Sequence, residues 1–263
     1  MAGSATAERG ARQQESSGPP LVRGLGPRRL RVIVIALAAV LLGAGVGWLL
    51  YGSPWLRVER VPVSGTAVLT PAQVREAADV PVGSPLVSVD TGAIEERLRE
   101  KLRRIDSVAV TRSWPDGIGL KVTERTPVLL VQKGRKFIEV DDEGVRFATV
   151  SRAPKGVPLL EAEPSPSSSA AASLRRFGED RLVREAVRTA GALPSAVARA
   201  TRVVKVRSYD DISLELSGGR TVAWGSAENG AAKSRTILAL MKASPDARHF
   251  DVSVPTAPAS AGS

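Results

Sequence analysis

The feature that most constrains this 263-residue chain is a run of twenty uncharged, mostly apolar residues, Val32–Tyr51. At a helical rise of about 1.5 Å per residue, such a run spans about 30 Å, the thickness of the hydrocarbon core of a bilayer. Its three alternate glycines, Gly43, Gly45 and Gly47, are more common in membrane helices than in soluble ones. The run therefore predicts one transmembrane helix over residues 32–51.

The residues on the two sides of this run differ, and the difference sets its orientation. Three arginines lie between Arg28 and Arg31, whereas Trp48, Tyr51 and Trp55 gather at the other end, where aromatic rings favour the headgroup layer. By the positive-inside rule, the N-terminus stays in the cytoplasm and the chain after the helix is exported. We therefore expect a single-pass type II protein of the cell membrane.

A cleaved signal peptide is the main alternative to this anchor. The preceding 31 residues are long for such a peptide, the apolar run is longer than its usual core, and no A-x-A site follows Leu50. A buried soluble helix does not account for the asymmetric flanking charge. Residues 1–31 contain few large apolar side chains, so we expect a disordered cytoplasmic tail, either a tether near anionic lipid or a docking segment.

The formal charge of +10 is compatible with nucleic-acid binding, but its distribution is not. Residues 1–31 carry a net +4, and the residues from Arg57 onward carry +6 over a long surface of mixed sign. Aromatic residues make up 4% of the chain, too few for base-stacking platforms. We therefore expect no nucleic-acid partner.

The residues needed for most enzyme chemistry are missing. The chain has no Cys and a single His, His249, which excludes disulfides and thiolate sites and disfavours multi-histidine metal sites and Ser-His-Asp catalysis. It contains no P-loop, dinucleotide fingerprint, nucleophile elbow or Ser-x-x-Lys motif. The acidic run Asp141–Glu143 lacks the spacing of a calcium loop and is interpreted as a turn. We expect no catalytic residues, metal site, cofactor, small-molecule substrate or enzymatic activity.

Residues 55–124 are predicted to form a small α+β module with the order strand, helix, helix, strand, strand. A three-stranded sheet covered on one face by two helices is the simplest packing of that order. Thr70 and Asp90 are the predicted N-caps of the two helices. The predicted elements are a strand over Leu56–Val61, helices to about Asp79 and Arg104, and strands over Val108–Arg112 and Ile118–Val122.

Residues 125–255 are predicted to form a second module, a mixed and mostly antiparallel β domain with flanking helices. The low-complexity residues 163–173 are expected to be a disordered loop, and residues 256–263 a disordered C-terminal tail. The last helix, about Ala232–Ala243, is expected to bury Ile237, Leu238, Leu240 and Met241, and Arg248–Val254 alternates as a closing strand. The other predicted elements are strands near Val128–Val131, Phe137–Val140, Val145–Phe147, Val203–Val206, Ile212–Leu216 and Thr221–Trp224, and a helix over Asp180–Thr189.

Several short motifs follow the anchor in a fixed order. They are Val63–Gly65, Gly83 with Leu86–Asp90, Arg112–Pro115 and Val122–Pro127 in the first module, and Gly144-Val145, Gly218-Gly219, Trp224-Gly225, Lys233 and Phe250–Pro255 in the second. In this order they resemble the FtsQ/DivIB family of bacterial cell-division proteins, in which a POTRA (polypeptide-transport-associated) domain precedes a C-terminal β domain. Thr66 and Asp106 depart from the family pattern. The residues that carry the resemblance as structural positions are Gly65, Gly83, Asp90, Arg112, Trp114, Pro115, Glu124, Arg125, Pro127 and Gly225.

The resemblance implies a divisome scaffold at the division septum. Its implied partners are the FtsB/DivIC–FtsL coiled-coil pair and the septal wall synthase complex. The closing strand is the candidate partner site, because no predicted element follows to cover its edge and a partner strand can add there by β-augmentation. The candidate residues are Arg248, His249, Phe250, Asp251, Val252, Ser253 and Val254.

Two alternatives remain open at this point. The closing strand can equally be paired inside the sheet. The chain can also be a membrane-anchored module that binds cell wall or extended chains through the predicted strand Arg57–Val61. Arg outnumbers Lys by 29 to 8 with abundant Ala, which favours a GC-rich, Gram-positive bacterial source.

Overall fold

A computed structural model describes residues 27–162 and 178–262 of the chain. The predicted tail therefore lies outside the described residues as far as residue 26, and the predicted loop 163–173 lies outside them entirely. The chain divides into two units between Ser53 and Pro54, and each unit is described by itself.

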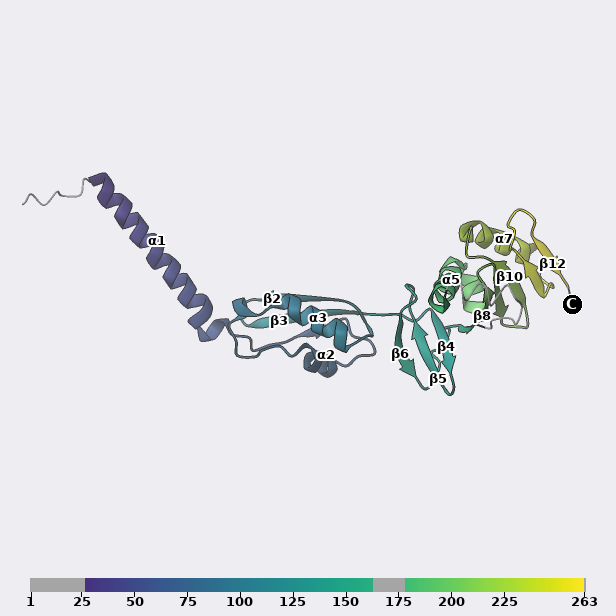
Figure 1. Ribbon diagram of the computed structural model, residues 1–263, viewed down its shortest axis with the longest axis horizontal. Helices are drawn as coiled ribbons and strands as arrows, with labels where there is room; N and C mark the ends of the chain where they lie inside the picture. Colours follow the sequence, from purple (N-terminus) through teal and green to yellow (C-terminus); the bar gives the residue numbers. More distant parts are fainter. Residues whose placement is uncertain (1–26, 163–177, 263) are drawn as a thin grey trace, which may run out of the picture. The chain divides into compact units, whose positions relative to one another are not determined.

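The N-terminal unit contains one helix, α1, over Pro27–Gly52 (Figure 1). It begins five residues before the predicted start, so Arg28, Arg29 and Arg31 lie within its first turns. By length and composition it is the one helix among the described residues that can cross a membrane. Its large apolar side chains are exposed along its whole length, as expected of a surface that faces lipid.

The described residues after Ser53 form an α+β unit with two sheets. We call residues 54–125 the first module and residues 126–262 the second module. The first module has a three-stranded sheet in the order β1-β3-β2, with β1 parallel and β2 antiparallel to β3. Its elements are η1 (Pro54–Leu56), β1 (Val63–Ser64), α2 (Pro71–Ala78), η2 (Leu86–Ser88), α3 (Thr91–Lys101), β2 (Ile105–Ser113) and β3 (Gly117–Glu124).

Local sequence signals position the two helices of this module. Thr70 caps α2 by accepting a hydrogen bond from the Gln73 amide at 3.2 Å, and the Gln73 side chain accepts one from the Thr70 amide at 2.9 Å. Asp90 caps α3 through the Ala93 amide. The helices pack on the sheet through one apolar core that includes Val74, Leu98 and Leu120. The predicted caps and packing are confirmed.

The predicted strand over Leu56–Val61 is wrong. This segment is extended but has only isolated bridges, from Arg57 to Pro85 and from Arg60 to Gly117, and the strand proper is the two-residue β1. The sequence alternates because Val58 is buried while Glu59 and Arg60 are exposed, and not because a ladder forms. The edge strand on this side of the sheet is therefore β1, and residues 57–61 contribute only the two bridges.

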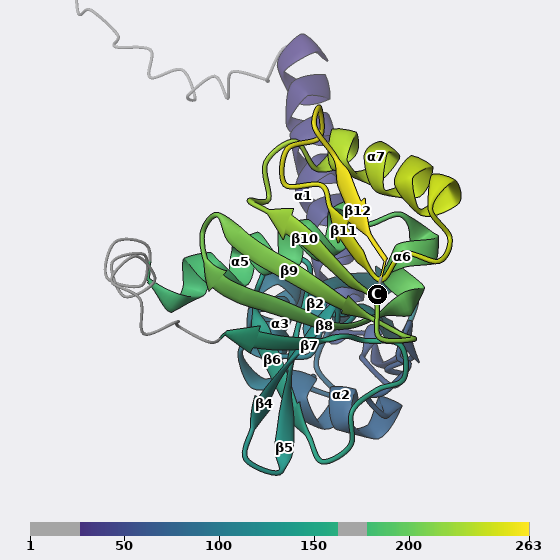
Figure 2. The ribbon, with the colours of Figure 1, turned by 90° about the vertical axis from the view of Figure 1, so that its right-hand side faces the viewer.

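The second module is a nine-stranded mixed sheet in the order β12-β11-β10-β9-β8-β7-β4-β5-β6. Three neighbouring pairs are parallel, β10/β11, β7/β8 and β4/β7, and the others are antiparallel. Figure 2 shows α7 beside strands β10–β12. The elements are β4 (Leu129–Lys133), β5 (Lys136–Val140), β6 (Arg146–Val150), β7 (Leu159–Ala162), α5 (Glu179–Ala192), α6 (Ser195–Ala200), β8 (Thr201–Ser208), β9 (Asp211–Leu216), β10 (Thr221–Gly225), α7 (Gly230–Ala243), β11 (His249–Asp251) and β12 (Ala259–Ala261).

The core of this module lies between the sheet and its helices. Trp224, Leu214 and Ile237 are completely or almost completely buried in it, and α5 contributes the predicted apolar stripe. Leu238 is 46% exposed, so its predicted burial is wrong. The reason is geometric: Leu238 follows Ile237 by one helical position, about 100° around α7, and so leaves the buried face.

The predicted disordered tail over residues 256–263 is also wrong in part. Ala259–Ala261 forms β12, which pairs antiparallel with β11. The closing strand of the prediction is shorter than expected, because β11 spans only His249–Asp251. The fold class predicted from the sequence is nevertheless correct.

Candidate functional site

The predicted partner strand lies inside the sheet and not at its edge. β11 pairs with β10 on one side and with β12 on the other, so β12 is the outermost strand at this side (Figure 2). All three residues of β12 are exposed. The open edge at the C-terminal side of the module is therefore Ala259–Ala261.

The seven predicted contact residues divide into two groups. Phe250 and Val252 are buried, and they pack in the core of the second module behind the edge. Arg248, His249, Asp251 and Val254 are exposed, and Ser253 is half-buried.

Two of the exposed residues make local contacts that shape the edge. His249 Nδ1 lies 2.7 Å from Thr221 Oγ1 on β10. Asp251 Oδ1 accepts hydrogen bonds from the Ser253 amide and hydroxyl, at 2.9 and 2.6 Å, which fixes the turn after β11.

Gly225 allows this turn to approach β10. Its φ is +75°, and a Cβ placed there meets the Cβ of Ser253 at 2.9 Å. Since side chains other than Gly rarely adopt that φ, both the conformation and the close approach require glycine. The family-motif residue Gly225 thus lets the last strands lie against β10.

A buried lysine ties α7 to the end of β10. Lys233 is 1% exposed, and its Nζ donates to the carbonyl oxygens of Trp224 and Ser226 at 2.9 and 2.8 Å. Burial lowers the pKa of Lys233, and the negative charges of Glu228 and Asp210 oppose this in part. The ammonium group donates to one carbonyl within β10 and to one just after it, which holds helix and sheet together behind the C-terminal edge.

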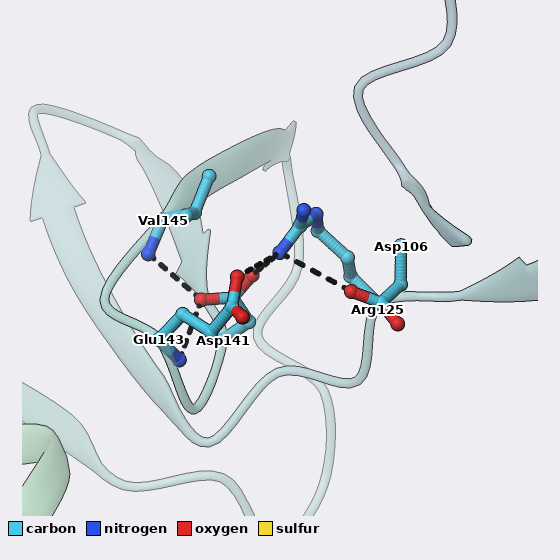
Figure 3. Close-up of polar contacts among 5 residues, drawn as sticks. All are labelled: Asp106, Arg125, Asp141, Glu143 and Val145. Atoms are coloured by element: carbon cyan, nitrogen blue, oxygen red, sulfur yellow. Dashed lines mark hydrogen bonds and ion pairs between the residues drawn. The ribbon is translucent and has the colours of Figure 1, made fainter. Parts of the chain in front are cut away.

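A second polar cluster lies where the first module meets the second (Figure 3). The Arg125 guanidinium is paired with Asp141, and its Nη1 also lies 3.2 Å from Glu143 Oε2 and 3.5 Å from Asp106 Oδ1. The other oxygen of Asp141 accepts hydrogen bonds from the amides of Glu143 and Val145. One buried carboxylate therefore closes the acidic turn and also binds the arginine that ends the first module.

A second ion pair joins Arg104 to the second module. Its guanidinium is paired with Glu139 on β5, whose side chain is only 4% exposed, and lies 5.2 Å from the centroid of the Phe147 ring on β6. The Arg125 amide donates to the Arg104 carbonyl at 2.8 Å, so the two arginines are held together. We call these contacts of Arg104 and Arg125 the joint.

The charge state of the joint follows from its contacts. Burial lowers the pKa of Arg125, but its hydrogen bonds to Asp141 and Glu143 and the charges of Asp141 and Asp106 raise it by more, so its pKa is raised overall. The arginine is fully charged at any physiological pH. Among the described residues, no group of His, Cys, Asp or Glu side chains forms a metal site.

Most of the other family-motif residues hold the backbone of the first module. Glu124 accepts hydrogen bonds from three consecutive amides, those of Ala67, Val68 and Leu69, and so fixes the loop before α2. Gly65 has a φ of +83°, and a Cβ there lies 2.0 Å from the Val122 carbonyl oxygen, so no other residue fits.

The remaining motif residues lie in loops of the two modules, except Arg112, which lies near the end of β2. Gly83 accepts a hydrogen bond from Arg57, and Arg112 donates to the carbonyls of Leu86 and Val89. Trp114 and Pro115 are exposed at the β2–β3 turn, while Pro127 lines a shallow pocket in the second module.

Sequence reasoning missed the joint and the true edge. The motif pointed to Arg125, but nothing local connects it to Asp141, sixteen residues later, or Arg104 to Glu139, thirty-five residues later. The acidic sequence around Asp141 predicts only a turn, which is half of the role of this residue.

Comparison with known proteins places these features in a family. Residues 56–125 match the family model described as "POTRA domain, FtsQ-type". The chain is 76% identical to the cell division protein FtsQ of Streptomyces coelicolor over 264 residues, covering 100% of both chains. The chain belongs to the FtsQ/DivIB family. The FtsQ of Streptomyces collinus is 73% identical, again over 100% of both chains.

Membership of the FtsQ/DivIB family supports a role in the bacterial division machinery, with α1 as a membrane anchor. The major extracytoplasmic domain of DivIB from Geobacillus stearothermophilus is a more distant likeness. It is 18% identical with a TM-score of 0.33, covering 46% of this chain and 94% of that one.

Proposed function

We propose that this FtsQ/DivIB member is a non-catalytic divisome scaffold that binds partner proteins through the C-terminal edge of its second module. The partners are the FtsB/DivIC–FtsL coiled-coil pair, and through them the septal wall synthase complex. The protein is a type II membrane protein of the septum, with the N-terminus cytoplasmic and both modules exported. The arginines at positions 28, 29 and 31, on the cytoplasmic end of α1, support this orientation.

The observation that carries the proposal is the character of β12. Exposed edge strands are normally guarded by charged side chains, because their unpaired backbone groups recruit other strands. β12 has a neighbouring strand on one side only, and its residues are Ala, Ser and Ala. No charged residue occurs between Val252 and the last residue of the sequence. The edge is therefore suited to the addition of a partner strand.

The exposed side chains near β12 supply the specificity that a backbone ladder lacks. Arg248, just before β11, and Asp251, its last residue, carry opposite charges, and Val254 is a 55% exposed apolar residue after the strand. A partner strand with complementary charges and one apolar residue fits this arrangement.

A proline scan of the edge tests the proposal. Ser260→Pro removes the N–H of the central β12 residue and cannot support an intact ladder, whereas Ser260→Ala keeps the backbone and is the matched control. Thr149→Pro introduces the same substitution in β6, the edge strand at the other end of the sheet. The readout is co-purification of the coiled-coil pair with the full-length chain in detergent.

We expect Ser260→Pro to abolish co-purification, and both Ser260→Ala and Thr149→Pro to retain it. Unchanged binding by Ser260→Pro contradicts the proposal. Equal losses from Ser260→Pro and Thr149→Pro also contradict it, because they indicate general destabilisation and not a specific edge.

A further inference from the structure

The end of the first module at which the chain enters is built from three segments. They are the entry segment Pro54–Arg60, the loop of residues 81–86, and the β2–β3 turn of residues 113–117. The Val58 amide donates to Ser84 at 2.9 Å, and the Glu59 amide donates to Asp116 at 2.8 Å. These backbone bonds hold the three segments together, and we call them the entry end.

Each segment of the entry end exposes one large apolar side chain. Trp55 is 83% exposed, Val82 66% and Trp114 54%, and none of the three belongs to the core of the module. Val68 is also exposed in this module, but it lies beside Glu124, at the other end of β3. Exposed tryptophans are costly in water, whereas the indole ring favours the boundary between lipid headgroups and acyl chains.

Guanidinium groups accompany these apolar side chains. Arg57 donates to the Gly83 carbonyl at 2.7 Å, and Arg112 to the carbonyls of Leu86 and Val89 at 3.1 and 2.7 Å. A guanidinium has five N–H donors, so each arginine keeps donors beyond these bonds.

The acidic residues of the entry end leave only a small positive excess. The hydrogen bond from Arg60 lowers the pKa of Asp116, so that pair stays ionised and mutually neutralised. Within the entry end Arg57 then balances Glu59, and Arg112, the residue just before the β2–β3 turn, brings the net charge to +1. The apolar side chains therefore dominate the character of this end, with two arginines suited to bind phosphate.

Covalent connection determines what this end meets. Helix α1 ends at Gly52, and the first module begins its backbone contacts at Arg57, five residues later. Five residues reach at most about 18 Å when fully extended, and less here because Pro54–Leu56 is a 3₁₀ turn. If α1 spans the bilayer, the entry end is held within that distance of the end of the helix.

We propose that the entry end of the first module docks on the headgroup layer of the bilayer, with Trp55, Val82 and Trp114 inserted at the interface and Arg57 and Arg112 on lipid phosphates. The proposal rests on the membrane anchoring of α1 and not on the partner edge. Docking fixes the angle at which the first module leaves the membrane. Since β3 runs from this end to Glu124, it also sets the direction from which the second module starts.

The absence of cysteine from the sequence makes a direct test possible. Val82→Cys and Val68→Cys introduce one thiol each, at valines that are 66% and 65% exposed in the same module. Each full-length variant carries a spin label and is reconstituted into phosphatidylcholine–phosphatidylglycerol vesicles. Collisions with oxygen, which partitions into lipid, are compared with collisions with a water-soluble nickel chelate.

We expect the ratio of oxygen to nickel collisions to be raised at position 82 and to have its aqueous value at position 68. Adding Trp55→Ser and Trp114→Ser to the Val82→Cys variant is expected to return position 82 to the aqueous value. An aqueous value at position 82 without those changes overturns the proposal, as does a raised ratio that survives them or that depends on the protein-to-lipid ratio. Co-purification of the coiled-coil pair by the same variants is expected to be unchanged, which separates this test from that of the proposed function.

Discussion

Arg125, the last residue of the first module, is paired with Asp141, a carboxylate of the second module that is 2% exposed. Asp141 also accepts hydrogen bonds from the amides of Glu143 and Val145, at 3.0 and 2.7 Å (Figure 3). Breaking a buried pair by removing one partner is far more destabilising than losing a surface pair, because the other charge stays behind without compensation. The joint is therefore the place where the stability of one module depends on residues of the other.

Asp141→Asn keeps the size of the side chain and removes its charge. We expect a loss of about 2–3 kcal/mol, below the full range for a buried pair, because Arg125 retains Glu143 and Asp106. Thermal unfolding of the full-length chain in detergent measures the change. Asp142→Asn, an exposed neighbour, is the matched control and is expected to change stability by less than about 0.5 kcal/mol. Equal effects from the two variants contradict the structural role of the pair.

Glu124→Gln tests the carboxylate that holds the loop before α2. Three consecutive amides donate to Glu124, and an uncharged oxygen is a weaker acceptor for them, so we expect a loss of about 1–3 kcal/mol. Glu100→Gln removes the same charge from an exposed position on α3 and serves as control. Hydrogen exchange is expected to increase at residues 67–69 in Glu124→Gln alone. Unaltered exchange there rules out this role.

Alanine substitutions at Gly65 and Gly134 distinguish the cost of a steric clash from the cost of backbone strain. Both have positive φ, +83° and +62°, but a Cβ at Gly65 meets the Val122 carbonyl oxygen at 2.0 Å, whereas nothing lies within 4 Å at Gly134. Gly134→Ala is expected to cost about 1–2 kcal/mol from conformation alone, and Gly65→Ala clearly more. Unfolding measurements that rank the two variants equally contradict the geometry.

The pKa of Lys233 gives a pH dependence with a definite sign. Because burial lowers this pKa below its ordinary value of 10.5, the unfolded chain holds the proton to higher pH than the folded chain. Between the folded and unfolded pKa values, deprotonation therefore favours folding, and stability from this group rises with pH. Lys233→Met lacks that contribution and leaves two carbonyls without their donor.

We therefore expect the stability advantage of the native chain over Lys233→Met to grow between neutral pH and about pH 10.5. Thermal unfolding at several pH values measures it. Lys242→Met, at the exposed end of the same helix, is the matched control. An advantage that shrinks with rising pH reverses the sign and contradicts the account of a buried amine.

The parts of the fold that the sequence predicts are those specified by neighbouring residues. Thr70 and Asp90 cap their helices through contacts three residues away, and the apolar stripe of α5 repeats with the helical period. The Leu56–Val61 prediction failed because burial of one side chain in an extended segment produces the same alternation as a strand.

The features that sequence reasoning missed depend on tertiary structure. β12 has no alternation, because Ala, Ser and Ala are all small, and its strand character comes only from pairing with β11. The ion pairs of the joint connect residues sixteen and thirty-five positions apart, and no periodicity relates such positions. The prediction placed the candidate edge on the strand that is β11, whereas the outermost strand beside it is β12.

The central claim is that a partner strand adds to β12. Hydrogen exchange of the full-length chain, with and without the coiled-coil pair, tests it most directly because backbone amides that gain a partner become protected. The account predicts new protection at residues 259–261, with little change at β6. Binding of the pair without protection at residues 259–261, or with protection confined to β6 or the first module, contradicts it.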